Sequence, residues 1–187
     1  MICELTGMDA SNASVYDGAT AAAEAAAMCR DRKRSTVYIS AASHPDVIQV
    51  VKTYCFGSNA KVVVVPETGG VTDADALAEL LAADPQAACF YMQQPNYYGC
   101  LEDADSLGRI AHEAGAKFIM GCNPISLALL KTPAECGADI AVGDGQPLGM
   151  SLAFGGPYLG FMAATAAMTR KLPGRIVGET KRRSGAT

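Results

Sequence analysis

The chain has 187 residues, of which 50% are hydrophobic and 18% are charged, and it contains no tryptophan. This length predicts one domain or at most a small pair, and it is enough to bury a core without disulfides or metals. The composition excludes a disordered chain and a disulfide-rich mini-protein. Much of the apolar half is alanine, which favours thin helices packed closely on a sheet, as in an α/β enzyme.

The net charge of −4 is unevenly distributed along the chain. Residues 1–169 hold 9 Lys and Arg against 18 Asp and Glu, whereas residues 170–187 hold 6 against 1. The acidic body argues against nucleic-acid binding, because a phosphate backbone requires a clustered basic surface. The basic end is predicted to be a solvated terminus or a patch that pairs with an acidic neighbour.

Seven cysteines and two histidines, His44 and His112, limit the metal and redox chemistry of the chain. The cysteines form no C-x-x-C pair and no secretory leader precedes them, so we expect reduced thiols in the cytoplasm. Because only two imidazoles are present, we predict no zinc site and no other metal site.

Residues 145–169 carry no charge and are numerous enough for a membrane span. The stretch contains five glycines and two prolines, and Gly155, Gly156 and Pro157 would break a helix in its middle. We therefore predict a buried loop with a tight turn at 155–157 that enters a strand over 158–163, and no membrane association.

The first elements are predicted to be helical. Residues 1–5 have the pattern of a helix end that Gly7 caps. Residues 20–34 predict a helix built on alanine that ends in four cations among its last five positions. Cations at that end would complement the helix dipole.

Downstream of residue 35, short β-branched runs alternate with amphipathic helical patterns. Strands are predicted at 36–40, 61–65, 89–93, 118–121 and 140–142, and helices at 46–56, 73–83 and 102–114. This alternation predicts right-handed crossovers and a mainly parallel α/β sheet with helices on both faces.

Ligands of such sheets collect at the carboxyl ends of the strands. The loops expected there hold most of the uncharged hydrogen-bonding groups of the chain, at residues 43–45, 66–70, 93–99, 122–124 and 143–146. We therefore expect an oriented small molecule to be held at this edge.

One short segment is a candidate phosphate site. Asp17, Gly18, Ala19 and Thr20 form a glycine turn that leads into the alanine helix, where backbone N–H groups can hold an anion. The same residues fit an ordinary helix cap, which is the favoured interpretation when these four residues are taken alone. The chain has no Walker A sequence, no G-x-G-x-x-G fingerprint and no G-x-S-x-G elbow, so these enzyme classes lack support.

Longer strings carry a family resemblance. VYDGATAAAEAA, QQPNYYGCLED, GADIAVGDGQPLG and LPGRIVGET, in this order, closely resemble the glycine decarboxylase P-protein family. Within that family the chain is most similar to subunit 1, the α chain of the two-subunit bacterial form. The resemblance covers nearly the whole chain, and residues 181–187 depart from it.

The resemblance implies the fold of the large domain of pyridoxal-phosphate enzymes of the aspartate-aminotransferase type, fold type I. Residues 1–187 would be the central part of that domain, with the family's N-terminal extension and C-terminal small domain absent. It also implies a glycine dehydrogenase (aminomethyl-transferring), an oxidoreductase that acts on CH–NH2 with a disulfide acceptor. The family decarboxylates glycine and passes the aminomethyl group to lipoyl H-protein, as a cytoplasmic heterotetramer of subunit 1 and subunit 2.

The resemblance also implies roles for residues at the strand ends. Asp17, Gly18, Ala19 and Thr20 match the cofactor-phosphate loop, and His44 lies where a ring stacks on the pyridine. Asn123 lies where an acid pairs with the pyridine nitrogen, and the segment 143–149, which includes Gln146, lies where the Schiff-base lysine would be. Residues 142–154 contain no lysine, so this site would be vestigial, with pyridoxal phosphate bound covalently by subunit 2.

Simpler interpretations of several residues remain open. His44 would cap the helix from Asp46, and Tyr97 and Tyr98 would be core or interface aromatics. The loops 96–99 and 155–158 are expected to contact another subunit. The alternative function is a truncated, catalytically inert binding or assembly fragment, while the missing lysine opposes a pyridoxal enzyme that acts alone.

Overall fold

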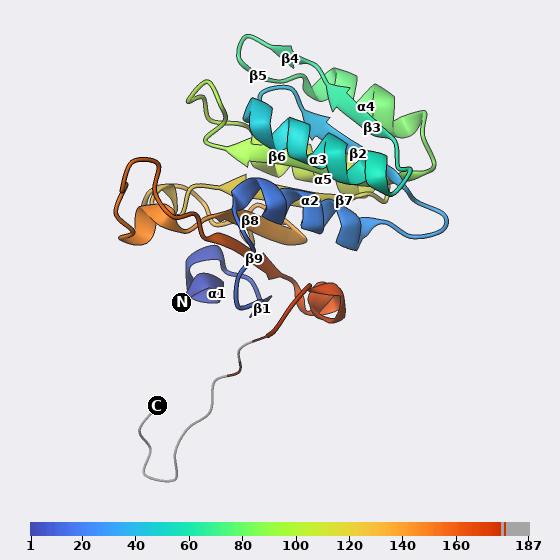
Figure 1. Ribbon diagram of the computed structural model, residues 1–187. Coiled ribbons are helices and arrows are strands. Elements are labelled where there is room, and N and C mark those ends of the chain that lie inside the picture. Colours follow the sequence, from blue (N-terminus) through green and yellow to red (C-terminus); the bar gives the residue numbers. More distant parts are fainter. Residues whose placement is uncertain (177, 179–187) are drawn as a thin grey trace.

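The structure is a computed structural model that describes residues 1–176 and 178 (Figure 1). The helices are α1 (Ile2–Thr6), α2 (Gly18–Cys29), α3 (Pro45–Gly57), α4 (Ala74–Ala82) and α5 (Ala104–Glu113). The strands are β1 (Ala10–Ser11), β2 (Thr36–Ser40), β3 (Val62–Val65), β4 (Glu67–Thr68), β5 (Val71–Thr72), β6 (Ala87–Gln94), β7 (Lys117–Cys122), β8 (Ile140–Asp144) and β9 (Gly160–Ala164). The basic segment 181–187 lies outside the described residues.

Seven strands form one sheet in the order β1-β9-β8-β7-β6-β2-β3. Parallel pairing joins β3, β2, β6, β7 and β8, which confirms the predicted mainly parallel α/β sheet. β9 runs antiparallel to β8, because the link between them contains no crossover helix that would return the chain to the other end of the sheet. The small β4–β5 hairpin lies between the predicted strand 61–65 and the predicted helix 73–83, and it is an addition to the predicted elements.

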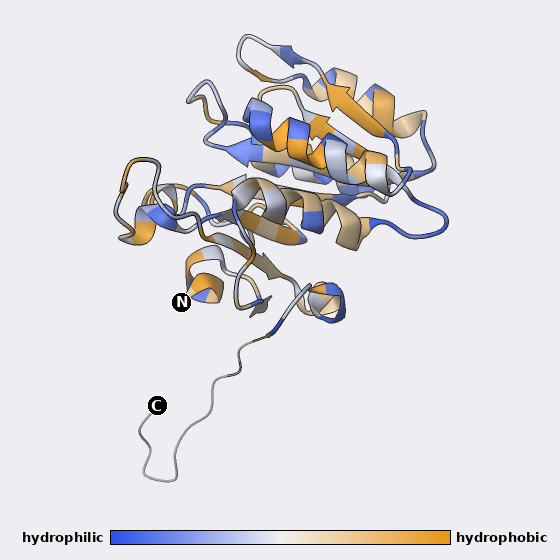
Figure 2. Ribbon diagram, in the orientation of Figure 1, coloured by the Kyte–Doolittle hydropathy of each residue, from blue (hydrophilic) through white to orange (hydrophobic). Residues whose placement is uncertain are grey.

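Two apolar layers separate the sheet from its helices. α2 and α3 cover one face, where alanines of α2 pack beside Val51, Ile39 and Val142. α4 and α5 cover the other, where Leu77 and Leu107 belong to one cluster with Phe90 of β6 and Phe118 of β7. Figures 1 and 2 show this arrangement, with the apolar strand β3 at one edge of the sheet. Alanine allows α2 to lie close to the strands, so its alanine-rich sequence has a packing cause.

The predicted end of the second helix is wrong. α2 begins at Gly18 and ends at Cys29, and Arg30 is already extended, so the four cations follow the helix. The Asp31 carboxylate accepts the backbone N–H groups of Lys33 and Arg34 at 2.7 and 2.9 Å and closes a turn. Arg34 then donates to the carbonyls of Ala87 and Ala114, 3.1 and 3.2 Å away. These cations therefore do not complement the α2 dipole in its last turn.

The predicted burial of the uncharged loop is also wrong. The residues between β8 and β9 are largely exposed, and Leu152 is 74% exposed. This loop lies beyond the carboxyl end of β8, where no described element covers it (Figure 1). The tight turn is confirmed, since Gly155 and Gly156 have φ values of 140° and 73°, and the strand follows as β9. None of the helices in the described part of the chain is long and apolar enough to cross a bilayer.

The other predicted elements are confirmed within a few residues. β2 has the predicted bounds, and Gly7 ends α1 in the left-handed conformation with φ 73°. α4 begins after its predicted cap, Asp73, whose side chain accepts the N–H of Ala76. α5 begins at Ala104 behind the cap Asp103, so Glu102, predicted as the first residue of this helix, lies outside it.

Candidate functional site

A cavity of about 460 Å³ lies at the carboxyl ends of β6, β7 and β8, beside the N-termini of α2 and α3. Five of the predicted site residues line it, namely Asp17, Gly18, Ala19, His44 and Asn123. Two others, Thr20 and Gln146, do not. The predicted edge of the sheet therefore does carry a cavity, and the strand order brings residues from six segments of the chain to it.

Carboxylates occupy the N-terminus of α2. Asp17 Oδ1 accepts the backbone N–H of Thr20 at 2.6 Å, so Asp17 is the helix cap. The N–H of Gly18 donates to Asp144 Oδ2 at 3.3 Å. A Cβ on Gly18 would lie 3.2 Å from the Asp144 nitrogen, so glycine permits this close approach to β8. Of the two interpretations of this segment, the geometry agrees with the cap.

His44 caps α3, as its simpler interpretation predicts. Its ring Nδ1 accepts the backbone N–H of Asp46 at 3.1 Å. The backbone N–H of His44 donates to Gln93 Oε1, also at 3.1 Å. The ring also meets Tyr97 edge to face at 5.1 Å between centroids. Tyr97 in turn contacts Tyr98 at 5.6 Å between centroids, so a row of three rings begins at His44, which lines the cavity.

The two neutral amides among the predicted residues serve turns. Asn123 is exposed, and its Oδ1 accepts the backbone N–H of Ile125 at 3.0 Å. Gln146 donates from Nε2 to the carbonyl of Met150 at 2.9 Å. Neither side chain brings a negative charge to the cavity, so the charge there comes from aspartates.

Tyr91 is a cavity residue that the sequence interpretation missed. It lines the cavity although the residue is only 4% exposed. Its hydroxyl lies beneath Gly121, where an added Cβ would come within 2.2 Å of Oη. Burial raises the pKa of Tyr91 far above its ordinary value, so the phenol is neutral. The alternation of side chains along the predicted strand 89–93 was the available signal, because it puts Tyr91 on the same face as Gln93.

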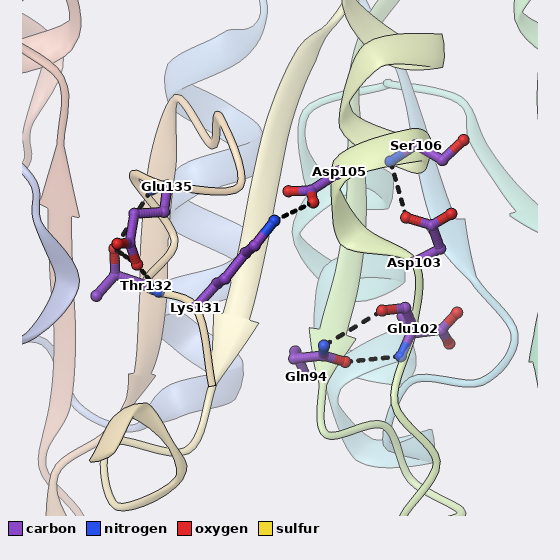
Figure 3. Close-up of polar contacts among 8 residues, drawn as sticks. All are labelled: Gln94, Glu102, Asp103, Asp105, Ser106, Lys131, Thr132 and Glu135. Atoms are coloured by element: carbon purple, nitrogen blue, oxygen red, sulfur yellow. Dashed lines mark hydrogen bonds and ion pairs between the residues drawn. The ribbon is translucent and has the colours of Figure 1, made fainter. Parts of the chain in front are cut away.

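A buried polar network fixes the loop after β6. Gln94 brackets Glu102, accepting its N–H at 2.8 Å and donating to its carbonyl at 3.3 Å (Figure 3). The Glu102 carboxylate accepts the N–H of Thr72 and the amide of Asn96, both at 2.9 Å. Glu102 therefore joins the hairpin to this loop, and the loop presents Tyr97 and Tyr98 half exposed.

A second charged cluster lies at the amino ends of β7 and β8, away from the carboxyl ends that form the cavity. Asp139 accepts from Lys117 at 2.7 Å and from the Phe118 N–H at 2.9 Å, and it lies 2.9 Å from His112. Burial alone would raise the pKa of Asp139, but these hydrogen bonds outweigh burial and hold the pKa below its ordinary value. Among the described residues no group of three or more His, Cys, Asp or Glu could hold a metal ion.

The described residues around the cavity do not fit pyridoxal phosphate as a covalent cofactor. No lysine lines the cavity, so no side chain there provides the amine for a Schiff base. The helix N-terminus that would hold the phosphate already has the carboxylates of Asp17 and Asp144 on its N–H groups. A phosphate would therefore meet like charges, and no reaction step at the cofactor is assigned to these residues.

Comparisons with known proteins agree with the family resemblance. The family model described as "Glycine cleavage system P-protein" matches residues 1–187. A "Probable glycine dehydrogenase (decarboxylating) subunit 1" of Syntrophomonas wolfei is 49% identical over 181 residues, which are 96% of this chain and 41% of the relative. The protein of the same description in Prosthecochloris aestuarii is 50% identical over 187 residues, 99% of this chain and 42% of the relative. The chain thus spans about two fifths of these relatives.

Solved structures agree with this assignment. The crystal structure of glycine decarboxylase (P-protein) of the glycine cleavage system, in inhibitor-bound form, superposes with a TM-score of 0.89 at 42% identity, over 100% of this chain and 41% of that chain. Cystathione gamma lyase (CalE6) from Micromonospora echinospora superposes with a TM-score of 0.70 at 18% identity, over 90% and 42%, which supports the fold alone. The expected fold, that of pyridoxal-phosphate enzymes of fold type I, is confirmed, and the chain belongs to the glycine cleavage system P-protein family.

Proposed function

We propose that this chain acts as part of subunit 1 of glycine dehydrogenase (decarboxylating) and supports the active site of subunit 2 in a cytoplasmic heterotetramer. Family membership and the names of its relatives support this role. The observation that carries it is the cavity, which has carboxylates at the helix N-terminus and no lysine. Residues 1–187 are assigned as the central part of the large domain.

In this assignment the cofactor belongs to the partner. Pyridoxal phosphate, held covalently by subunit 2, supplies the electron sink for glycine decarboxylation, and lipoyl H-protein receives the aminomethyl group. The contribution of this chain is positional. The Glu102 network holds the loop after β6, and strands β8 and β9 flank a second loop; in this proposal both loops contact subunit 2.

The two loops are those at residues 96–99 and 155–158. Tyr97 and Tyr98 are half exposed, and Tyr158 is 59% exposed. Further apolar side chains, Leu152 and Phe154, are exposed in the loop before Tyr158. Exposed apolar side chains that gather beyond one edge of a sheet are typical of an interaction surface.

The test combines the full chain with purified subunit 2, pyridoxal phosphate and glycine. We expect no glycine-dependent CO2 exchange from this chain alone and higher exchange when it joins subunit 2. Borohydride reduction followed by mass spectrometry should label subunit 2 only. A reduced adduct on this chain would contradict the supporting role. Unchanged exchange would instead favour a catalytically inert binding or assembly piece, an alternative that the partial coverage of the relatives motivates.

A matched pair of variants tests the loop contact. Phe154→Ser removes an exposed ring from the proposed contact loop, and Phe56→Ser removes an exposed ring at the end of α3. Because neither ring is buried, both variants should keep the unfolding free energy within about 0.5 kcal/mol of the parent. Only Phe154→Ser should weaken association with subunit 2 in analytical ultracentrifugation. Equal association of the two variants would refute the assignment of this loop.

A further inference from the structure

The charge in the cavity is negative throughout. Three carboxylates line it, those of Asp17, Asp46 and Asp144, and no Lys or Arg does among the described residues. His44 accepts the Asp46 N–H at Nδ1 and lies 3.9 Å from the Asp46 carboxylate. A ligand that binds here therefore meets an excess of negative charge, and the Coulomb interaction favours a cation over an anion.

Two of the helix N–H groups that could attract an anion are already used. Asp17 Oδ1 and Asp144 Oδ2 take the N–H groups of Thr20 and Gly18. Asp144 Oδ1 accepts the N–H groups of Gln146 and Leu159, at 2.8 and 3.4 Å. These bonds fix the position of Asp144, while Asp17 Oδ2 accepts no hydrogen bond within the described part of the chain.

A second observation at the same cavity is independent of the carboxylates. Tyr91 is more than nine-tenths buried, lines the cavity, and its hydroxyl has no hydrogen-bond partner among the described residues. The hydroxyl opens onto the cavity, so a ligand group that hydrogen-bonds to it gains a net free energy of about 0.5–1.5 kcal/mol on binding. The hydroxyl oxygen is an acceptor, which an N–H of a cation can use.

We propose that this cavity binds a small organic cation, a molecule with a guanidinium or primary ammonium group. Asp17 and Asp144 provide the opposite charge, and the Tyr91 hydroxyl accepts one N–H at the floor. The volume of about 460 Å³ is sufficient for a molecule of the size of an amino acid. This site does not depend on the role proposed for the chain in glycine decarboxylation.

The test compares two ligands of the same shape and different charge on the full chain. Methylguanidine carries a positive charge, and methylurea is its neutral counterpart. In a titration followed by ¹H–¹⁵N NMR, methylguanidine should produce saturable shifts at the amides of Gly18, Gly121 and Gly143, which line the cavity. Methylurea and inorganic phosphate should not. Equal shifts from the two organic ligands, or saturation by phosphate, would overturn the proposal.

Variants assign the binding to these residues. Asp144→Asn removes the charge and keeps an oxygen for the N–H of Gln146, so methylguanidine affinity should fall about tenfold. Tyr91→Phe should lower it about threefold to fivefold through the lost acceptor. Asp75→Asn in α4, on a helix away from the cavity, should leave affinity unchanged. Unchanged affinity in both cavity variants would refute the site.

A last arm separates a free ligand from a protein side chain. The same titration is repeated after subunit 2 has been added. Retained methylguanidine binding supports a small-molecule site in the assembled protein. Complete loss would overturn that proposal, because the assembled protein would then leave no free site for the small molecule.

Discussion

Gly121→Ala tests the packing at the floor of the cavity. The added Cβ would lie 2.2 Å from Tyr91 Oη and 2.9 Å from Cζ, both far inside normal contact distance. Tyr91 is buried in the cluster beneath α2 and α3, so its ring has little room to move. Overpacking of this kind costs about 1–3 kcal/mol, and two severe contacts place the expected loss near about 3 kcal/mol.

The hydroxyl provides an internal check of this cause. Tyr91→Phe removes Oη, which has no protein partner among the described residues, so alone it should change stability by less than about 0.5 kcal/mol. In the double variant the closest contact disappears, and the contacts with Cζ at 2.9 Å and Cε2 at 3.2 Å remain. The two substitutions should therefore be coupled by about 1–2 kcal/mol.

Urea unfolding followed by circular dichroism gives each free energy by linear extrapolation. Gly57→Ala is the matched control, because a Cβ there has no neighbour within 4 Å. It should be neutral or stabilise α3 by up to about 1 kcal/mol. Strict additivity of Gly121→Ala and Tyr91→Phe, or a neutral Gly121→Ala, would refute the packing argument.

Three further predictions concern buried polar groups. Glu102→Gln should lower the unfolding free energy by about 2–3 kcal/mol, because Thr72 and Asn96 donate to different carboxylate oxygens and the new amide NH2 would face one of these donors. Asp103→Asn, a cap change at an exposed neighbour, should cost under about 0.5 kcal/mol. Since the pKa of Asp139 is lowered in the folded chain, its stabilisation is present above the unfolded value of about 3.9 and is lost as pH falls through the folded pKa. Asp139→Asn should thus flatten the decrease in unfolding free energy measured from pH 5 to pH 3, and an unchanged slope would contradict this. With a disulfide reagent at pH 8, the partly exposed thiols Cys3 and Cys100 should react first. Cys122 should react only after unfolding, because burial raises the pKa of its thiol to about 12. Fast reaction of Cys122 in the folded chain would contradict its burial.

Local sequence patterns determined the parallel core. β2 and the caps of α3, α4 and α5 follow from β-branched runs and from side chains that bond to nearby N–H groups, interactions that span only a few residues. The alternation of strands and helices along the chain also predicted that the cavity lies at the carboxyl ends of the strands. The strings shared with the P-protein family identified the chain, because they need only the order of residues.

The tertiary structure decided which distant groups meet. α2 ends early because Arg34 reaches the carbonyls of Ala87 and Ala114, 53 and 80 residues away. Asp144 reaches Gly18 across 126 residues and turns a phosphate-like loop into a site already supplied with carboxylates. Hydrophobic periodicity reports which face of an element is buried, but not which strand lies beside it or which charge faces a cavity. Those depend on strand order and direction, so the sign of the charge in this cavity came from the fold.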